Sequence, residues 1–145
     1  MRKYYQGFFT PKHPEKYIGN INKIIFRSSY EKIFMIFLDT TETVIYWNSE
    51  GVAINYFDST TNTTRKYYPD FLIQVKTTDG IKSILIEIKP EKQTKIPNGK
   101  KMTKRLINET VMYQKNLDKW NSAKIWCSRN NVEFKILTEN DLGIT

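Results

Sequence analysis

Three side chains stand out because their types and spacing suit the binding of a divalent cation beside an amine. Asp70 follows Pro69 at the start of one apolar segment, and Glu87 and Lys89 stand two residues apart near the end of the next. Carboxylates hold hard divalent cations, and a lysine next to them can stabilise negative charge. The three residues therefore predict a metal site next to an amine, in a chain with a formal net charge of +8.

Strand periodicity places these side chains on one face. Residues 71–75 and 81–89 read as two strands with an Asp-Gly turn signal between them. Side chains alternate along a strand, so the acid and the lysine of the second strand point the same way. A two-residue loop would set Asp70 opposite Lys89, and a four-residue loop would set it opposite Glu87. A three-residue loop would break the shared face, so the site depends on an even loop length, and both even registers stay open.

A structural role is the alternative for this trio. Acid–lysine pairs across strands are ordinary surface features worth roughly 0.2–1 kcal/mol. The segment 84–88 is apolar on both faces, however, which is typical of a central, buried strand. Charges in such a place are costly unless they are paired or bound to metal. Burial therefore favours the metal-site interpretation.

Composition narrows the class of protein and of metal. The chain has 145 residues, of which 39% are hydrophobic and 14% aromatic, which indicates one globular domain over residues 1–145. It has no apolar run long enough to span a membrane and no signal peptide, so we expect no membrane partner. Cys127 is the only cysteine and His13 the only histidine of the chain, which excludes a zinc site built from these residue types. Carboxylate ligands remain, which indicate Mg²⁺ or Mn²⁺.

The positive charge is concentrated in the stretch 89–105, which has seven basic residues and one acid and reads as a loop leading into a helix. It begins where the face with the two acids and the lysine ends. A basic loop beside a carboxylate metal site suits a phosphodiester-cleaving enzyme, because the charge holds the backbone while the metal supplies the chemistry. The residues that we expect to bind DNA are Arg27, Lys92, Lys95, Lys100, Lys101, Lys104 and Arg105.

Capping and periodicity signals assign the first half of the remaining elements. Residues 1–22 show no periodicity and read as an irregular basic and aromatic arm, which either touches DNA or packs over the core. Ser28 and Glu31 form a capping box that starts a helix, so Glu31 is a reciprocal cap, a carboxylate of the site, or both. β-like runs then predict an antiparallel meander of four strands, at residues 43–47, 52–57, 65–75 and 81–89.

The second half of the chain adds helices. A stripe with helical spacing predicts helices over residues 103–119 and 122–130, with Asn130-Asn131 as a cap. A strand over 132–137 follows, and a second capping box at Thr138 predicts a short terminal helix. A strand that follows a helix can join the sheet beside the hairpin. The fold class is therefore α/β (α+β), with a central mixed β-sheet flanked by helices.

The order of these residues resembles that of the PD-(D/E)xK nuclease superfamily. The matching positions are Glu31 early in a helix, then Pro69-Asp70, then Glu87 and Lys89. The ending, from Lys119-Trp120 to Glu139, is similar to the catalytic domain of TnsA-type transposon endonucleases. The chain as a whole resembles the small head-completion nucleases of T-even-like tailed phages over nearly its full length.

The resemblance implies a restriction-endonuclease-like core. It also implies an endonuclease that cleaves double-stranded DNA and depends on Mg²⁺, for which Mn²⁺ can substitute. It implies that Asp70 and Glu87 bind the metal and that Glu31 completes the metal shell directly or through water. Lys89 would orient or activate the attacking water. In the head-completion family the implied role is to process DNA ends before a tail joins a filled capsid. That role implies capsid or portal proteins as partners, and a place in the host cytoplasm or the virion.

Other readings stay open beside this one. A transposon-end or repair nuclease would use the same chemistry, whereas a structural protein that binds DNA ends without cutting would not need the intact trio. The number of metal ions, one or two, and the choice between monomer and homodimer are equally open. The sequence shows no separate DNA-reading domain, which favours recognition of the DNA backbone, ends or structure over base sequence.

Overall fold

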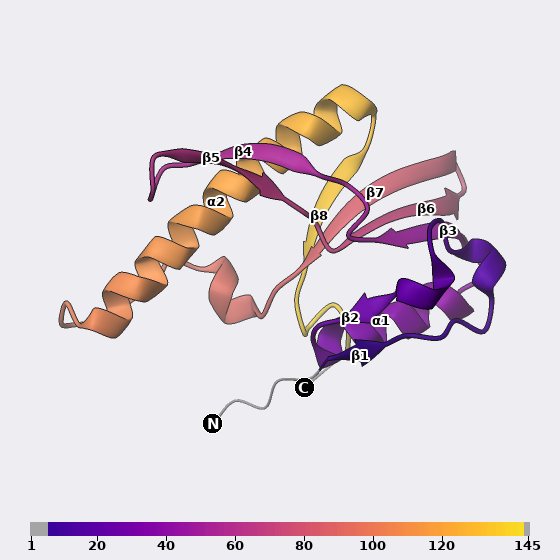
Figure 1. The fold of residues 1–145 in the computed structure, drawn as a ribbon, viewed down its shortest axis with the longest axis horizontal. Coiled ribbons are helices and arrows are strands. Elements are labelled where there is room, and N and C mark those ends of the chain that lie inside the picture. The colour runs from indigo at the N-terminus through magenta and orange to yellow at the C-terminus, as the bar shows by residue number, and fades with distance from the viewer. Residues whose placement is uncertain (1–5, 144–145) are drawn as a thin grey trace.

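A four-stranded mixed β-sheet separates two helical layers in the computed structural model, which describes residues 6–143 (Figure 1). In spatial order its strands are β3 (Val44–Ser49), β6 (Phe71–Thr77), β7 (Gly80–Ile88) and β8 (Glu133–Leu137). The pair β7–β8 is parallel, and the other two pairs are antiparallel. The predicted α+β class, with a mixed central sheet and flanking helices, is confirmed.

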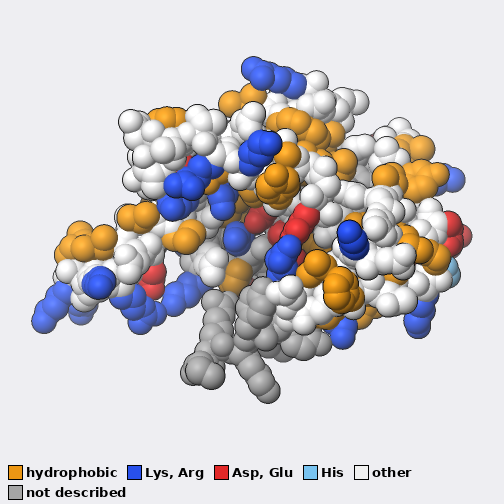
Figure 2. Space-filling view, viewed as in Figure 1, with side chains coloured by type: hydrophobic (Ala, Val, Ile, Leu, Met, Phe, Trp, Pro, Cys, Tyr) orange, Lys and Arg blue, Asp and Glu red, His pale blue; other side chains and the backbone are white. Residues whose placement is uncertain are grey.

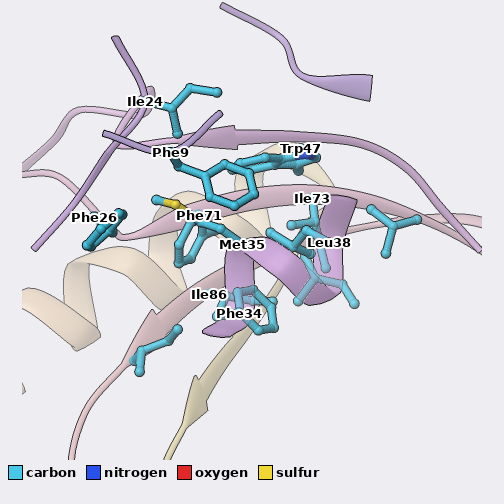
Figure 3. Packing of buried hydrophobic residues seen from close by; sticks show 13 residues of the cluster. Phe9, Ile24, Phe26, Phe34, Met35, Leu38, Trp47, Phe71, Ile73 and Ile86 are labelled. Carbon is cyan, nitrogen blue, oxygen red and sulfur yellow. The ribbon is translucent and has the colours of Figure 1, made fainter. Parts of the chain in front are cut away.

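Helix α1 (Ser29–Thr40) covers one face of the sheet. It begins as the capping box predicted, because the Ser28 hydroxyl accepts the backbone N–H of Glu31 at 3.2 Å. The inward side of the helix packs against strands β3, β6 and β7 in an apolar core (Figure 3). That core consists of Phe9, Ile24, Phe26, Phe34, Met35, Leu38, Val44, Trp47, Phe71, Ile73, Ile84, Ile86 and Ile88.

The segment before α1 packs against this helix and core. Its elements are β1 (Gly7–Phe8), which pairs with β2 (Ile25–Phe26), and the 3₁₀ turns η1 (Pro14–Lys16) and η2 (Ile21–Lys23). The buried Asp39 of α1 accepts the backbone N–H groups of Lys12 and His13 at 2.8 and 2.9 Å. Lys16 donates to carbonyls at the end of α1. Packing is thus the role that the structure gives to residues 6–22 of the predicted arm, whereas residues 1–5 lie outside the described residues.

Helix α2 (Lys104–Asn130) lies over the other face, together with a ribbon of strands β4 (Ile54–Asp58) and β5 (Thr63–Tyr67). A second core joins them to the sheet. It consists of Ile54, Tyr56, Tyr67, Leu85, Trp120, Ala123 and Cys127. The N-terminal half of α2 extends away from the sheet (Figure 1).

The two separate helices predicted for residues 103–130 are wrong, because α2 is one continuous helix of 27 residues. Asn121 and Ser122 have only modest helix penalties. The buried stripe of α2 runs past them with helical spacing and holds both halves on one packing surface. Its members are Asn116, Trp120, Ala123 and Cys127. Asn131 ends the helix in the left-handed conformation, with φ of 56°, as the Asn130-Asn131 signal indicated.

The predicted four-strand meander is also wrong. Strand β3 pairs directly with β6, and β4–β5 form a two-stranded ribbon outside the main sheet. The run predicted as one strand over 65–75 is divided at Pro69, which has no backbone N–H for a ladder. The chain therefore leaves the sheet after β3, makes the ribbon over α2, and returns as β6.

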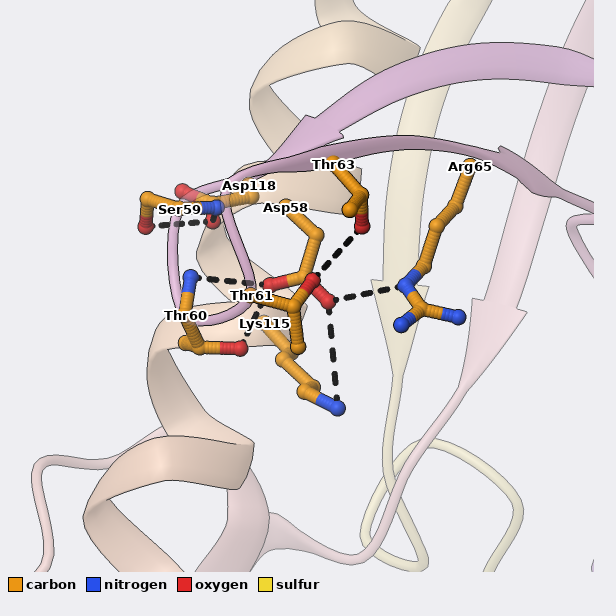
Figure 4. Close-up of polar contacts among 8 residues, drawn as sticks. All are labelled: Asp58, Ser59, Thr60, Thr61, Thr63, Arg65, Lys115 and Asp118. Atoms are coloured by element: carbon orange, nitrogen blue, oxygen red, sulfur yellow. Dashed lines mark hydrogen bonds and ion pairs between the residues drawn. The ribbon is translucent and has the colours of Figure 1, made fainter.

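Polar contacts fasten the tip of the ribbon to α2 (Figure 4). Asp58 is fully buried, and its Oδ1 accepts the backbone N–H of Thr60 at 2.9 Å while its Oδ2 lies 3.2 Å from Arg65 Nε. Ser59 donates its N–H and its hydroxyl to Asp118 of α2 at 2.9 and 2.7 Å. The hydrogen bond from the Thr60 hydroxyl is the main cause that lowers the pKa of Asp58 to about 2. These contacts fix the position of the ribbon over the helix.

The C-terminal segment forms turns over the described residues. The second capping box does form, since the Thr138 N–H donates to Asp141 Oδ2 at 2.8 Å. The helix predicted to follow it is absent up to residue 143, where the described part of the chain ends. Within residues 6–143, the helices are too short or too polar to cross a membrane.

Candidate active site

The pairing of β6 with β7 brings the two predicted acids together. Phe71 pairs with Ile86, so Asp70, one residue earlier, comes opposite Glu87. This is the register predicted for the four-residue loop. The Asp79-Gly80 two-residue loop is wrong, because pairing continues to Thr77 and Gly80 and leaves residues 78 and 79 as the turn. Gly80 has φ of +116°, a conformation that side chains disfavour.

Alternation along β7 decides which face carries the site. Ile84, Ile86 and Ile88 enter the core under α1, and Leu85 enters the core under α2. Glu87 shares the parity of Leu85, so its carboxylate points to the α2 side of the sheet. The Tyr67 hydroxyl, at the end of the ribbon on that side, donates a hydrogen bond to Glu87 Oε2.

Asp70 and Glu87 form a pair of enclosed carboxylates. Glu87 is buried, and Asp70 Oδ2 accepts the backbone N–H of Ile88 at 2.7 Å. Burial, followed by the charge of Glu87, raises the pKa of Asp70 well above its usual value. Burial also raises the pKa of Glu87. Two adjacent carboxylates that resist ionisation would be stabilised in their charged forms by a cation between them.

Lys89 completes the predicted trio. Its Nζ lies 3.7 Å from Glu87 Oε1, and its side chain is 27% exposed, so it borders both the carboxylate pair and solvent. The backbone N–H of Lys89 donates to the Leu137 carbonyl at 2.9 Å, which continues the parallel pairing of β7 with β8. The predicted face with Asp70, Glu87 and Lys89 is therefore present.

Glu31 stands apart from this trio. It belongs to the first turn of α1, where its Oε2 accepts the Ser28 hydroxyl at 3.1 Å, and burial raises its pKa. Its charge still contributes to the raised pKa of Asp70, so the two carboxylates are within electrostatic reach. Within residues 6–143, however, no three acidic, histidine or cysteine side chains are gathered closely enough to hold an ion. The structure thus shows the cap contact and does not bring Glu31 into one ligand set with the pair.

Two further side chains of the α2 side were missed by the sequence analysis. Lys119 of α2 places its Nζ 5.7 Å from the ring centre of Tyr67 and 5.9 Å from that of Tyr56. Burial and then the charge of Lys89 lower the pKa of Lys119, and the charge of Glu87 opposes that shift. The sequence analysis gave neither residue a role at the site, because the ribbon and α2 meet only in the folded chain. The Lys119-Trp120 pair, which belongs to the segment that resembles TnsA-type endonucleases, is a signal that could have indicated the location of Lys119.

The predicted DNA-binding residues fall into two groups. Arg27 lies before α1, where its Nε is 2.8 Å from Glu50 Oε1, and the Glu50 N–H donates to the Asp70 carbonyl at 3.0 Å. The others lie in the segment after β7, which includes the 3₁₀ turn η3 (Glu91–Thr94), and in the first turn of α2. All six are exposed, and two of them pair with nearby acids. They are Lys92, Lys95, Lys100, Lys101, Lys104 and Arg105.

In the view of Figure 2, acidic side chains lie near the middle of the molecule with basic side chains beside them. A second group of basic side chains lies at the N-terminal end of α2.

The segment after Lys89 is anchored by Glu139, whose Oε1 accepts the Glu91 N–H at 2.9 Å. The other oxygen of Glu139 accepts the Tyr30 hydroxyl of α1 at 3.4 Å. The C-terminal segment thereby connects the basic loop to α1.

Comparison with known proteins supports the resemblance found in the sequence. Residues 41–139 match the family described as TnsA-like endonuclease N terminal, a span that includes Asp70, Glu87 and Lys89 and begins after Glu31. The head completion nuclease of Enterobacteria phage T4 is 37% identical over 143 residues, which cover 95% of this chain and 93% of that protein. No solved structure matches the chain. The chain therefore belongs to the TnsA-like endonuclease family and is a homologue of the head completion nuclease.

Proposed function

We propose that this protein hydrolyses phosphodiester bonds of DNA as an endonuclease that depends on Mg²⁺ or Mn²⁺, with Asp70 and Glu87 as metal ligands. The observation that carries the proposal is the pair of enclosed carboxylates with a lysine 3.7 Å from one of them. A purely structural site has no need for two neighbouring acids whose burial opposes their ionisation.

The donor set fits this class of metal. Mg²⁺ prefers oxygen ligands and commonly takes only one or two protein carboxylates, with water and substrate phosphate as its other ligands. Asp70 and Glu87 supply two carboxylates, and we propose that Glu31 contributes through a water molecule rather than directly. A bound ion would supply charge neutralisation at the phosphate and a more acidic water.

The protein's own residues have separate tasks in this proposal. The N–H of Ile88 and the hydroxyl of Tyr67 hold Asp70 and Glu87 in fixed orientations. Lys89 faces solvent beside Glu87 and would orient the attacking water and stabilise the negative charge that develops on the phosphate. The exposed lysines between η3 and α2 would hold the DNA backbone.

The name of the homologue supports a biological role for this activity. That relative is named a head completion nuclease, so we propose that this chain processes ends of double-stranded DNA during phage head completion. It would act in the host cytoplasm or in the virion, with capsid or portal proteins as partners, as a monomer or a homodimer. The basic loop supports contact with the DNA backbone rather than with base sequence.

One observation favours a second candidate, a protein that binds DNA ends without cutting them. Glu31 is held by Ser28 and is not part of a three-carboxylate set within the described residues. A site with too few ligands would bind metal weakly and cleave slowly, while the basic surface would still bind DNA.

Cleavage of linear and circular double-stranded DNA with Mg²⁺ distinguishes the two candidates. Wild type should cut, and Asp70→Asn should not, because the amide keeps an acceptor for the Ile88 N–H but loses the charge that a cation needs. Glu133→Gln is the matched control, since Glu133 is an exposed acid of β8 that pairs with Lys82 away from the site. Salt-sensitive binding without cutting by wild type would replace the nuclease proposal with the second candidate.

A further inference from the structure

We propose that Lys119 of α2 is a second lysine of the active site, which contacts the scissile phosphate opposite Lys89 and stabilises the charge that develops during hydrolysis. This inference rests on the proposed nuclease function and assigns a further residue to the same site. Sequence spacing does not join the two lysines, because Lys119 is thirty residues beyond Lys89 and belongs to another element.

Lys119 lies close to the buried Glu87. Tyr67 donates its hydroxyl to Glu87, and the Nζ of Lys119 lies 5.7 Å from the ring centre of the same tyrosine. Lys119 therefore borders the carboxylate pair across one aromatic ring. The rings of Tyr67 and Tyr56 hold the ammonium by cation–π attraction, which fixes a flexible side chain in place.

The charge of Lys119 also favours a contact with phosphate. Lys119 is partly buried. Burial and the repulsion of Lys89 lower its pKa, while the attraction of Glu87 opposes that shift, so its ammonium lies within electrostatic reach of both groups. Putting a cation close to another lysine and away from water is costly. Within residues 6–143, Lys119 has the two tyrosine rings beside it but forms no salt bridge with a carboxylate. A bound phosphate between the two ammonium groups would provide the missing negative charge.

Phosphodiester hydrolysis develops negative charge that a second lysine can stabilise. When water attacks a phosphodiester, one P–O bond forms and another breaks, and negative charge builds on the phosphoryl oxygens and the leaving oxygen. A fixed cation in a partly dehydrated site stabilises such charge more strongly than one in bulk water. Lys89 reaches the phosphate from the sheet, and Lys119 would reach it from the helix that covers that face.

The test uses Lys119→Met and Lys119→Arg in the full chain, with cleavage measured under single-turnover conditions at saturating DNA and Mg²⁺. Methionine keeps an apolar stem over the two tyrosine rings but removes the charge, so the melting temperature should not fall. We expect Lys119→Met to slow cleavage by about 10²–10³-fold, the usual effect of losing one charge-stabilising donor. Its Kd for DNA in a chelator should change by less than about threefold, because one phosphate contact among several contributes little to overall binding.

Lys119→Arg should recover much of the rate because it restores the charge. Lys124→Met is the matched control, since Lys124 is exposed on the same helix, and it should cut at the wild-type rate. The proposal is overturned if Lys119→Met cuts as fast as wild type, if its slower rate is accompanied by a matching loss of stability, or if higher Mg²⁺ restores the rate. The last result would mean that Lys119 acts on metal binding rather than on phosphate. Failure of wild type to cut would instead refute the proposed nuclease function, and this inference with it.

Discussion

The two faces of the central sheet differ in what they bury. The core under α1 consists of apolar side chains, from Phe34 and Leu38 of the helix to Ile86 of β7 (Figure 3). The buried acids of that helix, Glu31 and Asp39, lie near its two ends. The face under α2 mixes Tyr67 and Trp120 with the buried Glu87, and it brings the charged groups of Asp70, Glu87 and Lys89 together. A single strand serves both faces, because β7 alternates its side chains between them.

This difference separates stability from chemistry. Burial on the α1 face removes apolar area from water and contributes about 1.5–3 kcal/mol for each fully buried large side chain. Burial on the α2 face keeps carboxylates and a lysine partly dehydrated, which costs free energy and sharpens their electrostatic effects. We therefore expect changes on the first face to alter folding, and changes on the second to alter cleavage.

The largest effect is expected from Lys89→Ala on the α2 face. The variant should fold, because Lys89 is partly exposed, and should lose cleavage by about 10³-fold or more through the missing charge at the phosphate. Single-turnover cleavage and the melting temperature, measured side by side, check both parts. Cleavage by the purified variant at the wild-type rate would remove Lys89 from the site.

The matching change on the α1 face is Leu38→Ala. Leu38 is fully buried, so the free energy of unfolding should fall by about 2–5 kcal/mol, the usual cost of such a cavity. The cleavage rate per folded molecule should stay as in wild type. Ile36→Ala on the exposed side of the same helix is the control and should change stability by about 0.5 kcal/mol or less. A slower cleavage step in folded Leu38→Ala would show that the two faces are not independent.

Burying Asp70 and Glu87 on the α2 face costs free energy, so the stability of the metal-free protein should depend on pH. The pKa values of Asp70 and Glu87 are raised in the folded state, so the folded protein binds more protons than the unfolded chain between their ordinary values, about 4, and the raised ones. The free energy of unfolding should therefore rise as the pH falls through this window, and Asp70→Asn should reduce that rise. Urea unfolding in a chelator at several pH values measures the difference. An identical pH dependence in wild type and Asp70→Asn would contradict the coupling.

The smallest effect is expected outside both faces, in the loop before α2 and at the first residue of that helix. Replacing Lys100, Lys101 and Lys104 with glutamine should weaken DNA binding and lower the slope of log K against log salt by about 0.9 for each lost phosphate contact. The cleavage rate at saturating DNA should not change, because these exposed lysines are remote from the carboxylates in sequence and make no contact with them in the described structure. Lys76→Gln, an exposed lysine near the β6–β7 turn, is the control for total charge. An equal loss of binding per charge removed, one in the control and three in the loop variant, would mean that charge alone, rather than this loop, attracts DNA.

Local sequence rules predicted the hairpin that carries the site. Alternation and an even loop placed Asp70, Glu87 and Lys89 on one face, and the structure confirms that face with Asp70 opposite Glu87. Of the two loops left open, the two-residue loop at Asp79-Gly80 was misplaced by one residue, because the observed turn consists of residues 78 and 79 and ends at Asp79. The shared face does not depend on this choice, because either even register places all three side chains on it.

Non-local packing explains what the sequence did not reveal. The ribbon β4–β5 leaves the sheet, and its tip is fixed to α2 by Asp58 and Ser59, contacts between segments about sixty residues apart. Continuity of α2 likewise depends on a stripe that packs on the ribbon and sheet. Tyr67 and Lys119 reach Glu87 only through this packing, and no spacing rule in the sequence joins them.

Metal binding by the α2 face is the central claim, and calorimetric titration with Mn²⁺ tests it most directly. Wild type should bind Mn²⁺, and Asp70→Asn should lose that binding, while Glu133→Gln on the exposed surface of β8 should bind as wild type does. Equal Mn²⁺ affinity in wild type and Asp70→Asn would contradict the assignment of the Asp70–Glu87 pair as the metal site.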